Sequence, residues 1–515
     1  MPRLALKPDS SFFRKIVIGA IGTRAVSNNL AQYGHAIVEL ERGSMDTKLW
    51  KDVKRKRVRI PDLVCTRCGL RVESRAKTNS ELAMSHSVTD EARSWDFGMV
   101  DSDLIAFPVC KAIDEDYWSA GRLGVDSSYW HERNWVRWLC GMHINYFETR
   151  SFRSIPHTRT GTKGVTEGSE TTVSWDAIFC SRSGTVERTE GGKLTIRRGS
   201  DGHRHTRAIP DRFQVFVQTG DSVEVNQVIA GSIEPLTHGN LRCPGVLPQG
   251  HISQLLQSRE RTQRFTGVKL ARIRGESEFC DAIRDLAGDN EEDVYVRLEA
   301  AAYLAAICCL QEPGVFQTFL TSPDQQTQLE AAITLGETGT PGAVILLSAI
   351  LEDRRQPYFL RSAAAWSLGR IGDEESARKL IQSFADFDLN IRDEALQGIV
   401  SIGGPALPLL LANLRDSDQD VAAGCAEALR EQQPLQPETV QRIAEEIRSG
   451  DRADWAIWLA GNIPRDQIAV AIAELQESRP ELHYVVTLLW SFIESWIARR
   501  WEVKPGAPGR GNGPN

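Results

Sequence analysis

Apolar residues recur with the spacing of an amphipathic helix in four segments of the C-terminal half, residues 297–304, 328–339, 361–372 and 392–403. The segments begin 31, 33 and 31 residues apart, and a fainter copy follows at residues 421–429. Each contains alanine followed by leucine or isoleucine, and the second, third and fourth segments end in glycine. A period of this length predicts stacked helix pairs. Alanine would allow close contacts, and glycine would supply a left-handed cap.

This pattern resembles short HEAT repeats of the kind related to phycobilin-lyase repeats, with an arginine, an alanine pair, then Leu-Gly and Ile-Gly. The resemblance implies an α-solenoid of HEAT repeats over residues 268–450. Such a solenoid is a scaffold that binds a partner, here expected to be a protein, because the repeat pattern itself carries no catalytic groups. The alanines expected at helix–helix contacts are Ala300, Ala331, Ala364 and Ala395.

Two further segments follow the repeats. Residues 451–503 predict capping helices, in which tryptophans seal the last repeat. The apolar stretch at residues 482–497 is interrupted by polar residues and favours a buried or capping helix over a membrane span. The Pro- and Gly-rich tail over residues 504–515 cannot form a core and is expected to be disordered.

The N-terminal part has a different pattern. Residues 11–33 show the apolar spacing of a helix, and four shorter runs predict strands at residues 36–40, 60–65, 70–77 and 103–110. A helix with strands of this length predicts an α/β domain over residues 10–150. Its candidate nucleic-acid-binding residues form one basic run, which would neutralise backbone phosphates: Lys54, Arg55, Lys56, Arg57 and Arg59.

Two acids and two basic residues lie on the predicted hairpin that follows this run. They occur as Pro61-Asp62 and as Glu73-Ser-Arg75-Ala-Lys77. The arrangement resembles the PD-(D/E)xK nuclease superfamily, which implies a restriction-endonuclease-like fold and Mg²⁺-dependent cleavage of a phosphodiester. Two converging carboxylates can hold Mg²⁺, and alternation along a strand places Glu73, Arg75 and Lys77 on one face.

The match departs from the family in two ways. The family's lysine belongs at the position of Arg75, which can act only electrostatically, so Lys77 is the candidate for the lysine's role. The N-terminal helix also lacks the glutamate that many members carry, for which Glu39 or Glu41 could substitute. The alternative is an ordinary hairpin with exposed charges.

The same hairpin carries Cys65-Thr-Arg-Cys68, which is half of a zinc site. The nearest pair of suitable form is Cys140-Gly-Met-His143, and together the two pairs would make a Cys₃His tetrahedron. The alternative is that these cysteines are buried thiols that bind no metal. A single C-x₂-C pair without a matching second pair is only a weak indication of a zinc site.

A third pattern lies between the head and the repeats. Residues 158–240 are rich in Thr, Ser, Gly and Val with strand alternation, which predicts a small all-β module. Residues 213–230 resemble the barrel-sandwich hybrid of biotinyl and lipoyl domains. They contain no lysine, so a swinging-arm role is not expected.

The distribution of charge and the number of cysteines give further predictions. Residues 1–250 hold 35 Lys and Arg against 29 Asp and Glu, whereas residues 251–515 hold 26 against 39. This asymmetry fits a head that contacts a polyanion, although two unrelated surfaces would give it as well. The 10 cysteines, with Cys308 among those interpreted as small apolar residues, are too few for a disulfide scaffold. With no membrane span expected, the chain is predicted to be cytoplasmic.

The sequence therefore predicts a Mg²⁺-dependent nuclease, acting on DNA in restriction, repair or defence, with a HEAT scaffold. The rival is a non-catalytic adaptor that binds nucleic acid or a protein. A third hypothesis, a relative of chromophore lyases, rests on the repeats alone.

Overall fold

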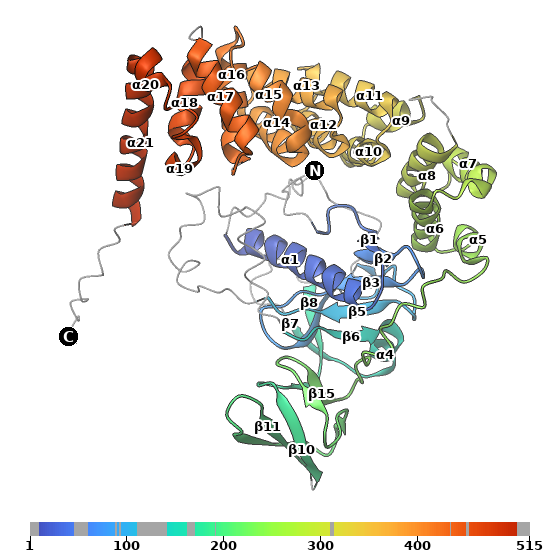
Figure 1. Ribbon diagram of the computed structural model, residues 1–515. Helices are drawn as coiled ribbons and strands as arrows, with labels where there is room; N and C mark the ends of the chain where they lie inside the picture. The colour runs from blue at the N-terminus through green and yellow to red at the C-terminus, as the bar shows by residue number, and fades with distance from the viewer. Residues whose placement is uncertain are drawn as a thin grey trace, which may run out of the picture. The chain divides into compact units, whose positions relative to one another are not determined.

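The computed structural model describes residues 10–45, 60–87, 90–91, 94–110, 142–161, 170–190, 192–308, 314–432, 434–449 and 453–501. The chain divides into two compact units, Met1–Tyr303 and Leu304–Asn515 (Figure 1). The expected start of the solenoid at residue 268 therefore falls inside the first unit.

The first unit is built on a five-stranded mixed sheet in the order β1-β2-β3-β5-β6. Strands β1 to β3 pair antiparallel, β3 runs parallel to β5, and β5 is antiparallel to β6. The five strands are β1 (Ile37–Glu39), β2 (Leu63–Cys65), β3 (Arg71–Ser74), β5 (Leu104–Phe107) and β6 (Asn145–Glu148). The strands predicted near these positions are present, each shorter than the apolar run that indicated it.

Helix α1 (Ser10–Gln32) lies along one face of this sheet (Figure 1). Val26 and Leu30 of the helix pack with Leu63, Val72 and other buried residues of the strands. A side chain at Gly22 would place its Cβ only 2.5 Å from the Cβ of Ala76, so glycine allows the helix to cross close to the end of β3. The opposite face of the sheet packs a second core rich in aromatic residues: Phe107, Phe147, Phe152, Trp95 and Trp175.

Smaller sheets continue the first unit. Strand β4 (Leu82–Ser87), from the predicted head, pairs with β8, from the predicted β-module, so one sheet joins the two segments. The remaining strands are β7 (Thr158–Gly161), β8 (Glu170–Trp175), β9 (Ala177–Phe179), β10 (Gly184–Glu190), β11 (Lys193–Arg198), β12 (Arg204–Ala208), β13 (Gln214–Val215), β14 (Ser222–Val223) and β15 (Val228–Gly231). Helix α4 (Thr149–Ser154) follows β6 directly.

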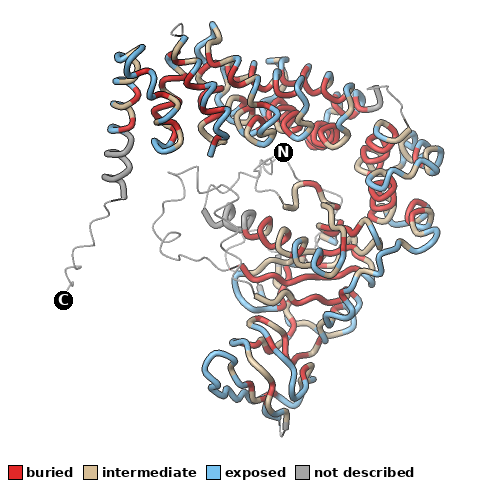
Figure 2. The backbone as a smooth tube through the Cα atoms, in the orientation of Figure 1, coloured by how far each residue is buried: buried red, intermediate tan, exposed pale blue. Residues whose placement is uncertain are grey.

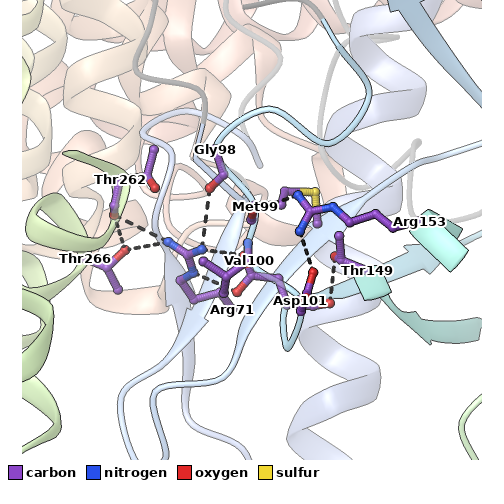
Figure 3. A network of polar contacts seen from close by, with 10 residues as sticks. Arg71, Gly98, Met99, Val100, Asp101, Thr149, Arg153, Thr262 and Thr266 are labelled. Carbon is purple, nitrogen blue, oxygen red and sulfur yellow. Dashed lines mark hydrogen bonds and ion pairs between the residues drawn. The ribbon is translucent and has the colours of Figure 1, made fainter. Parts of the chain in front are cut away.

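Buried ion pairs tie the main sheet to the helices that end the first unit. The guanidinium of Arg71 in β3 forms an ion pair with Asp103, and its Nη1 donates to Thr266 Oγ1 at 3.3 Å (Figure 3). Arg42 and Arg272 both pair with Glu299, which is fully buried. Because a buried charge is costly unless it is paired, these contacts favour one fixed packing of helices on sheet. The helices are α5 (His251–Leu256), α6 (Arg261–Arg274), η6 (Ser277–Phe279), α7 (Cys280–Gly288) and α8 (Val294–Ile307).

The second unit is helical, and its buried residues run along the packed sides of its helices (Figure 2). Its repeat helices are α9 (Gly314–Leu320), α10 (Gln325–Thr338), α11 (Pro341–Glu352), α12 (Tyr358–Ile371), α13 (Glu374–Gln382), η7 (Ser383–Ala385), α14 (Leu389–Ile402), η8 (Gly404–Ala406), α15 (Leu407–Ala412), α16 (Gln419–Glu431) and α17 (Pro437–Ser449). The four repeat alanines Ala300, Ala331, Ala364 and Ala395 are all fully buried, which confirms the predicted register.

Glycine has two separate roles in these helices. Gly339 and Gly372 follow α10 and α12 with φ of 61° and 70°, which confirms them as left-handed caps. Gly369 lies inside α12, where an added Cβ would be 2.6 Å from the Cα of Gly398 in α14. The glycine of the repeat's Leu-Gly pair therefore allows two helix backbones to approach closely.

The chain after the repeats forms α18 (Asp454–Asn462), α19 (Arg465–Ile468), α20 (Leu475–Ser478) and α21 (Pro480–Trp501). Trp490 is buried and donates from Nε1 to the carbonyl of Ala460 at 3.0 Å, as expected for a cap on the last repeat. The other face of α21 exposes Tyr484, Leu488 and Phe492. Within the described part of the chain, no individual helix has the length and apolar character to cross a membrane. One sharply bent pair, Leu389–Ile402 with Gly404–Ala412, meets that standard when taken together.

The cysteines fall into two chemical states. Cys280 and Cys308 are each disulfide-bonded, so the expectation that Cys308 is a small apolar residue is wrong. Among the described residues, Cys65, Cys68, Cys110, Cys180, Cys243 and Cys425 carry free thiols.

Candidate functional site

The β2–β3 hairpin brings Asp62 and Glu73 together. Leu63 pairs with Val72, and continuing this antiparallel register by one residue places Asp62 opposite Glu73. Directly opposed residues project to the same face of a sheet, which here is the face away from the α1 side, where Leu63 and Val72 point. The backbone N–H of Ser74 donates to Asp62 Oδ2 at 2.8 Å and fixes the orientation of that carboxyl group.

A third acid, Glu41, lies just after the neighbouring strand β1. The backbone N–H groups of Leu40 and Glu41 both donate to the carbonyl of Asp62, at 2.8 and 3.2 Å. Burial raises the pKa of Asp62 well above its usual value, and the charges of Glu73 and Glu41 raise it further. A bound cation would relieve this unfavourable effect of burial and like charge on Asp62.

Glu41, and not Glu39, is therefore the acid whose charge acts on Asp62. The carboxylate of Glu39 accepts hydrogen bonds from the backbone N–H groups of Met45, at 2.6 Å, and Gly43, at 3.4 Å. It stabilises the turn that follows β1. The two candidates that the sequence could not separate thus have different surroundings.

Arg75 lies directly against the acids. Its Nη2 is 3.1 Å from Glu73 Oε1 and donates to the carbonyl of Trp95 at 3.0 Å. Its positive charge also lowers the pKa of Asp62, against the larger effects that raise it. Arginine stays protonated at any pH a protein tolerates, so this guanidinium is a permanent positive charge beside the carboxylates.

Lys77 lies one strand repeat further on. Strand β3 ends at Ser74, but the pairing with the β5 side continues, because Arg75 N–H donates to Ala106 and Lys77 N–H donates to Pro108. Lys77 Nζ is 3.7 Å from Glu81 Oε1, and burial lowers the pKa of the ammonium group. The predicted strand face is thus present, but Arg75 is the basic residue paired with Glu73.

The predicted phosphate-binding run cannot be placed. Lys54, Arg55, Lys56, Arg57 and Arg59 lie outside the residues that the structure describes.

The thiols of the hairpin have different neighbours from those predicted. Among the described residues, one group of side chains could bind a metal ion. Its potential ligand atoms all lie within 4.8 Å of one another and belong to His35, Cys65, Cys68 and Cys243. His143 is not in this group. Its Nδ1 lies 3.3 Å from Glu224 Oε2, and its ring is 5.8 Å from that of His238. Cys140 lies outside the described residues. Among the described residues, His35 and Cys243 are the ones that accompany the hairpin cysteines.

Sequence reasoning missed these two residues because nothing local marks them. His35 follows α1 and carries no spacing relative to the C-x₂-C pair. Cys243 lies in the segment Leu-Arg-Cys-Pro-Gly, 178 residues after Cys65. Only the fold brings these residues together.

Comparison with known proteins gives a family for part of the chain. Residues 312–397 and 360–430 match HEAT repeats. No curated protein matches the chain.

Several solved structures are similar to this chain at low identity. YibA of Escherichia coli is 14% identical over 48% of this chain and 92% of its own, with a TM-score of 0.25. Human deoxyhypusine hydroxylase is 19% identical over 43% and 82%, with a TM-score of 0.18. The CpcE–CpcF complex of phycocyanin lyase from Nostoc is 18% identical over 51% and 91%, with a TM-score of 0.18.

The recurrent buried alanines, the glycine contacts between repeat helices and the family match agree with one another. The helical region spanning residues 312–430 consists of HEAT repeats.

Proposed function

We propose that the first unit is a Mg²⁺-dependent nuclease that cleaves a phosphodiester of nucleic acid, and that the HEAT repeats recruit a protein partner. The observation that carries this proposal is the opposed pair Asp62 and Glu73 on one hairpin, with Glu41 beside them. The helix, the strand and the acid-bearing hairpin also follow one another in the order that the PD-(D/E)xK resemblance implies.

Carboxylate oxygens are the hard ligands that Mg²⁺ prefers, and Asp62 and Glu73 each offer them on one hairpin. Burial raises the pKa of Asp62, and the nearby negative charges of Glu73 and Glu41 raise it further, so a cation would be favoured there. Asp62 and Glu73 would be the ligands, and the hydrogen bond from Ser74 N–H to Asp62 Oδ2 would leave Oδ1 for the ion. When bound, Mg²⁺ supplies positive charge next to the scissile phosphate and lowers the pKa of water there.

The basic residues have separate roles in this proposal. Arg75 holds Glu73 in place and offsets the negative charge that develops on the phosphate. Lys77, whose pKa is lowered by burial, orients the attacking water through Nζ, and the nearby carboxylate of Glu81 opposes that lowering. The basic run at residues 54–59 would neutralise neighbouring phosphates.

The scaffold part of the proposal is supported by exposed aromatic groups on the repeats. Phe387 and Tyr358 are 64% and 52% exposed, and the guanidinium of Arg354 lies 5.3 Å from the ring centroid of Phe387. Aromatic residues and arginine are the types enriched at protein interfaces.

A second candidate function is a non-catalytic adaptor. One observation favours it, since the guanidinium of Arg75 already occupies one carboxylate oxygen of Glu73. In this alternative the head binds nucleic acid without cleaving it.

Cleavage assays separate the two functions. The full chain is incubated with supercoiled plasmid, linear duplex, single-stranded DNA and RNA, each with Mg²⁺ and with EDTA. The nuclease proposal expects products from at least one substrate with Mg²⁺ and none with EDTA. Binding without cleavage of any substrate, with Mg²⁺ or with Mn²⁺, would leave the adaptor.

A further inference from the structure

The group formed by His35, Cys65, Cys68 and Cys243 comes from three separate parts of the first unit. His35 follows α1, the two hairpin cysteines flank the turn between β2 and β3, and Cys243 lies in the segment before α5. We propose that these four residues bind one zinc ion, which staples the candidate catalytic hairpin to the helix before it and to the segment after the β-sheets. This proposal does not depend on nuclease activity.

Two of the distances between the ligand atoms match those of a tetrahedral zinc site, and all four atoms lie within 4.8 Å of one another. With zinc about 2.3 Å from sulfur and about 2.0 Å from nitrogen, two sulfurs lie about 3.8 Å apart, and a sulfur and a nitrogen about 3.5 Å apart. Cys65 Sγ is 3.9 Å from Cys243 Sγ, and Cys68 Sγ is 3.6 Å from His35 Nδ1. A disulfide between Cys65 and Cys243 would instead require about 2.0 Å.

The imidazole is oriented as in a ligand histidine. Nε2 of His35 lies 2.9 Å from the carbonyl of Leu241, so a proton on Nε2 is donated there and Nδ1 is left to face Cys68. Ligand histidines usually donate their second N–H to a carbonyl or a carboxylate in this way. The same segment supplies Cys243 two residues later, so one short stretch provides both a ligand and the group that orients another.

The backbone around the cysteines is also fixed. Gly69 N–H donates to the carbonyl of Cys65 at 2.9 Å and closes the turn between the two hairpin cysteines. Gly69 has φ of +76°, and an added Cβ would lie 2.6 Å from Nε2 of His251. Cys243 N–H donates to the carbonyl of Tyr33, and Gly245 N–H lies 3.4 Å from Cys243 Sγ. A glycine and an N–H directed at sulfur are suited to a compact cysteine turn around a metal.

Burial indicates a structural site. Cys65 is fully buried and His35 is 6% exposed, while Cys68 and Cys243 are partly buried. Four protein ligands complete the tetrahedron and leave no position for water, which distinguishes structural from catalytic zinc. The ion would therefore hold the hairpin that carries Asp62 and Glu73 without taking part in the reaction.

Metal content tests the proposal directly. The full chain, purified without chelator from medium that contains zinc, should hold about one zinc per chain, as a closed four-ligand site implies. Cys243→Ser and His35→Asn should reduce this content to less than half. Cys180→Ser is the matched thiol control, and Cys140→Ser and His143→Asn test the other Cys₃His set. All three should keep the full zinc content.

A spectroscopic experiment covers variants that fold poorly. Replacing zinc with Co²⁺ should give the intense visible absorption of tetrahedral cobalt and a charge-transfer band from three thiolates. His35→Cys should retain the metal and raise that band by one thiolate, because cysteine is an equivalent ligand. Folded wild-type protein that holds no zinc and does not take up Co²⁺ would overturn the proposal. Loss of the metal in Cys140→Ser or His143→Asn with retention in Cys243→Ser would overturn it as well.

Discussion

Asp62 stands opposite Glu73 across the β2–β3 hairpin, and the N–H of the next residue, Ser74, donates to the Asp62 carboxyl group at 2.8 Å. The pair is close enough for the charge of Glu73 to raise the pKa of Asp62, in addition to the larger effect of burial. Without a cation, an ionised Asp62 is therefore unfavourable in the folded chain. This cost can be measured without any substrate.

We expect Asp62→Asn to stabilise the metal-free protein at neutral pH. Below the ordinary aspartate pKa of about 3.9, the wild-type carboxyl is protonated in both the folded and the unfolded chain, and the variant should have no advantage. Above it, the unfolded chain loses the proton while the folded chain keeps it, so wild-type stability falls until the pH passes the raised folded pKa. The gain should reach at least about 1 kcal/mol in urea unfolding at pH 7.

Magnesium provides the internal check on this result. The ion should stabilise the wild type and leave Asp62→Asn almost unchanged, because it needs the ionised carboxylate. Asp176→Asn, at an exposed carboxylate paired with Arg212, serves as the control and should show neither effect. A less stable Asp62→Asn at pH 7 would show that Asp62 is not held in an unfavourable charge cluster.

Part of this site could be predicted from sequence. Asp62 precedes β2, Glu73 lies in β3 and Arg75 follows it, so a local hairpin with strand alternation is enough to bring them to one face. Glu41 follows a third strand, β1, and its distance from Asp62 depends on how β1 pairs with β2. His35 and Cys243 required the packing of α1 and of a segment far along the chain, which no spacing rule contains.

Ala364→Arg should destabilise the second unit by about 3 kcal/mol or more, since a long charged side chain replaces a methyl group in a filled contact. Ala364 is fully buried in α12. Ala349→Arg in α11, where the alanine is exposed, is the matched control and should change stability by less than about 0.5 kcal/mol. Equal effects of the two substitutions in chemical denaturation would refute the proposed repeat register.

Gly369→Ala should destabilise the protein, although alanine inside a helix is usually more stable than glycine. Alanine is ordinarily better than glycine inside a helix by about 1 kcal/mol. Here the new Cβ would lie 2.6 Å from the Cα of Gly398, so the two helices must separate, at a cost of about 1–3 kcal/mol. Gly19→Ala in α1, where no heavy atom lies within 4 Å of the added Cβ, should follow the ordinary rule. Both are measured by denaturant unfolding, and a more stable Gly369→Ala would contradict the close packing of α12 on α14.

The repeats could be predicted because the same residue types recur at the same positions in each one. Small residues at Ala331 and Ala364, glycine caps and an apolar stripe recur at nearly constant spacing, and each repeat packs mainly on its neighbours. The limits of the first unit were less predictable. The strand β4 pairs with β8 across a predicted boundary, and Arg71 binds Asp103 and Thr266 from distant parts of the chain. Long-range pairing of this kind leaves little trace in a local pattern.

If Asp62 and Glu73 perform Mg²⁺-dependent cleavage, loss of one carboxylate should separate cleavage from binding. Wild type, Asp62→Asn and the control Asp176→Asn are compared on the same labelled nucleic acid, with cleavage followed in Mg²⁺ and binding followed in EDTA. We expect Asp62→Asn to lose cleavage by at least about 100-fold while its binding stays within about twofold, because the acid acts on the metal and not on the phosphate backbone. Cleavage by Asp62→Asn at the wild-type rate would contradict the proposed nuclease function.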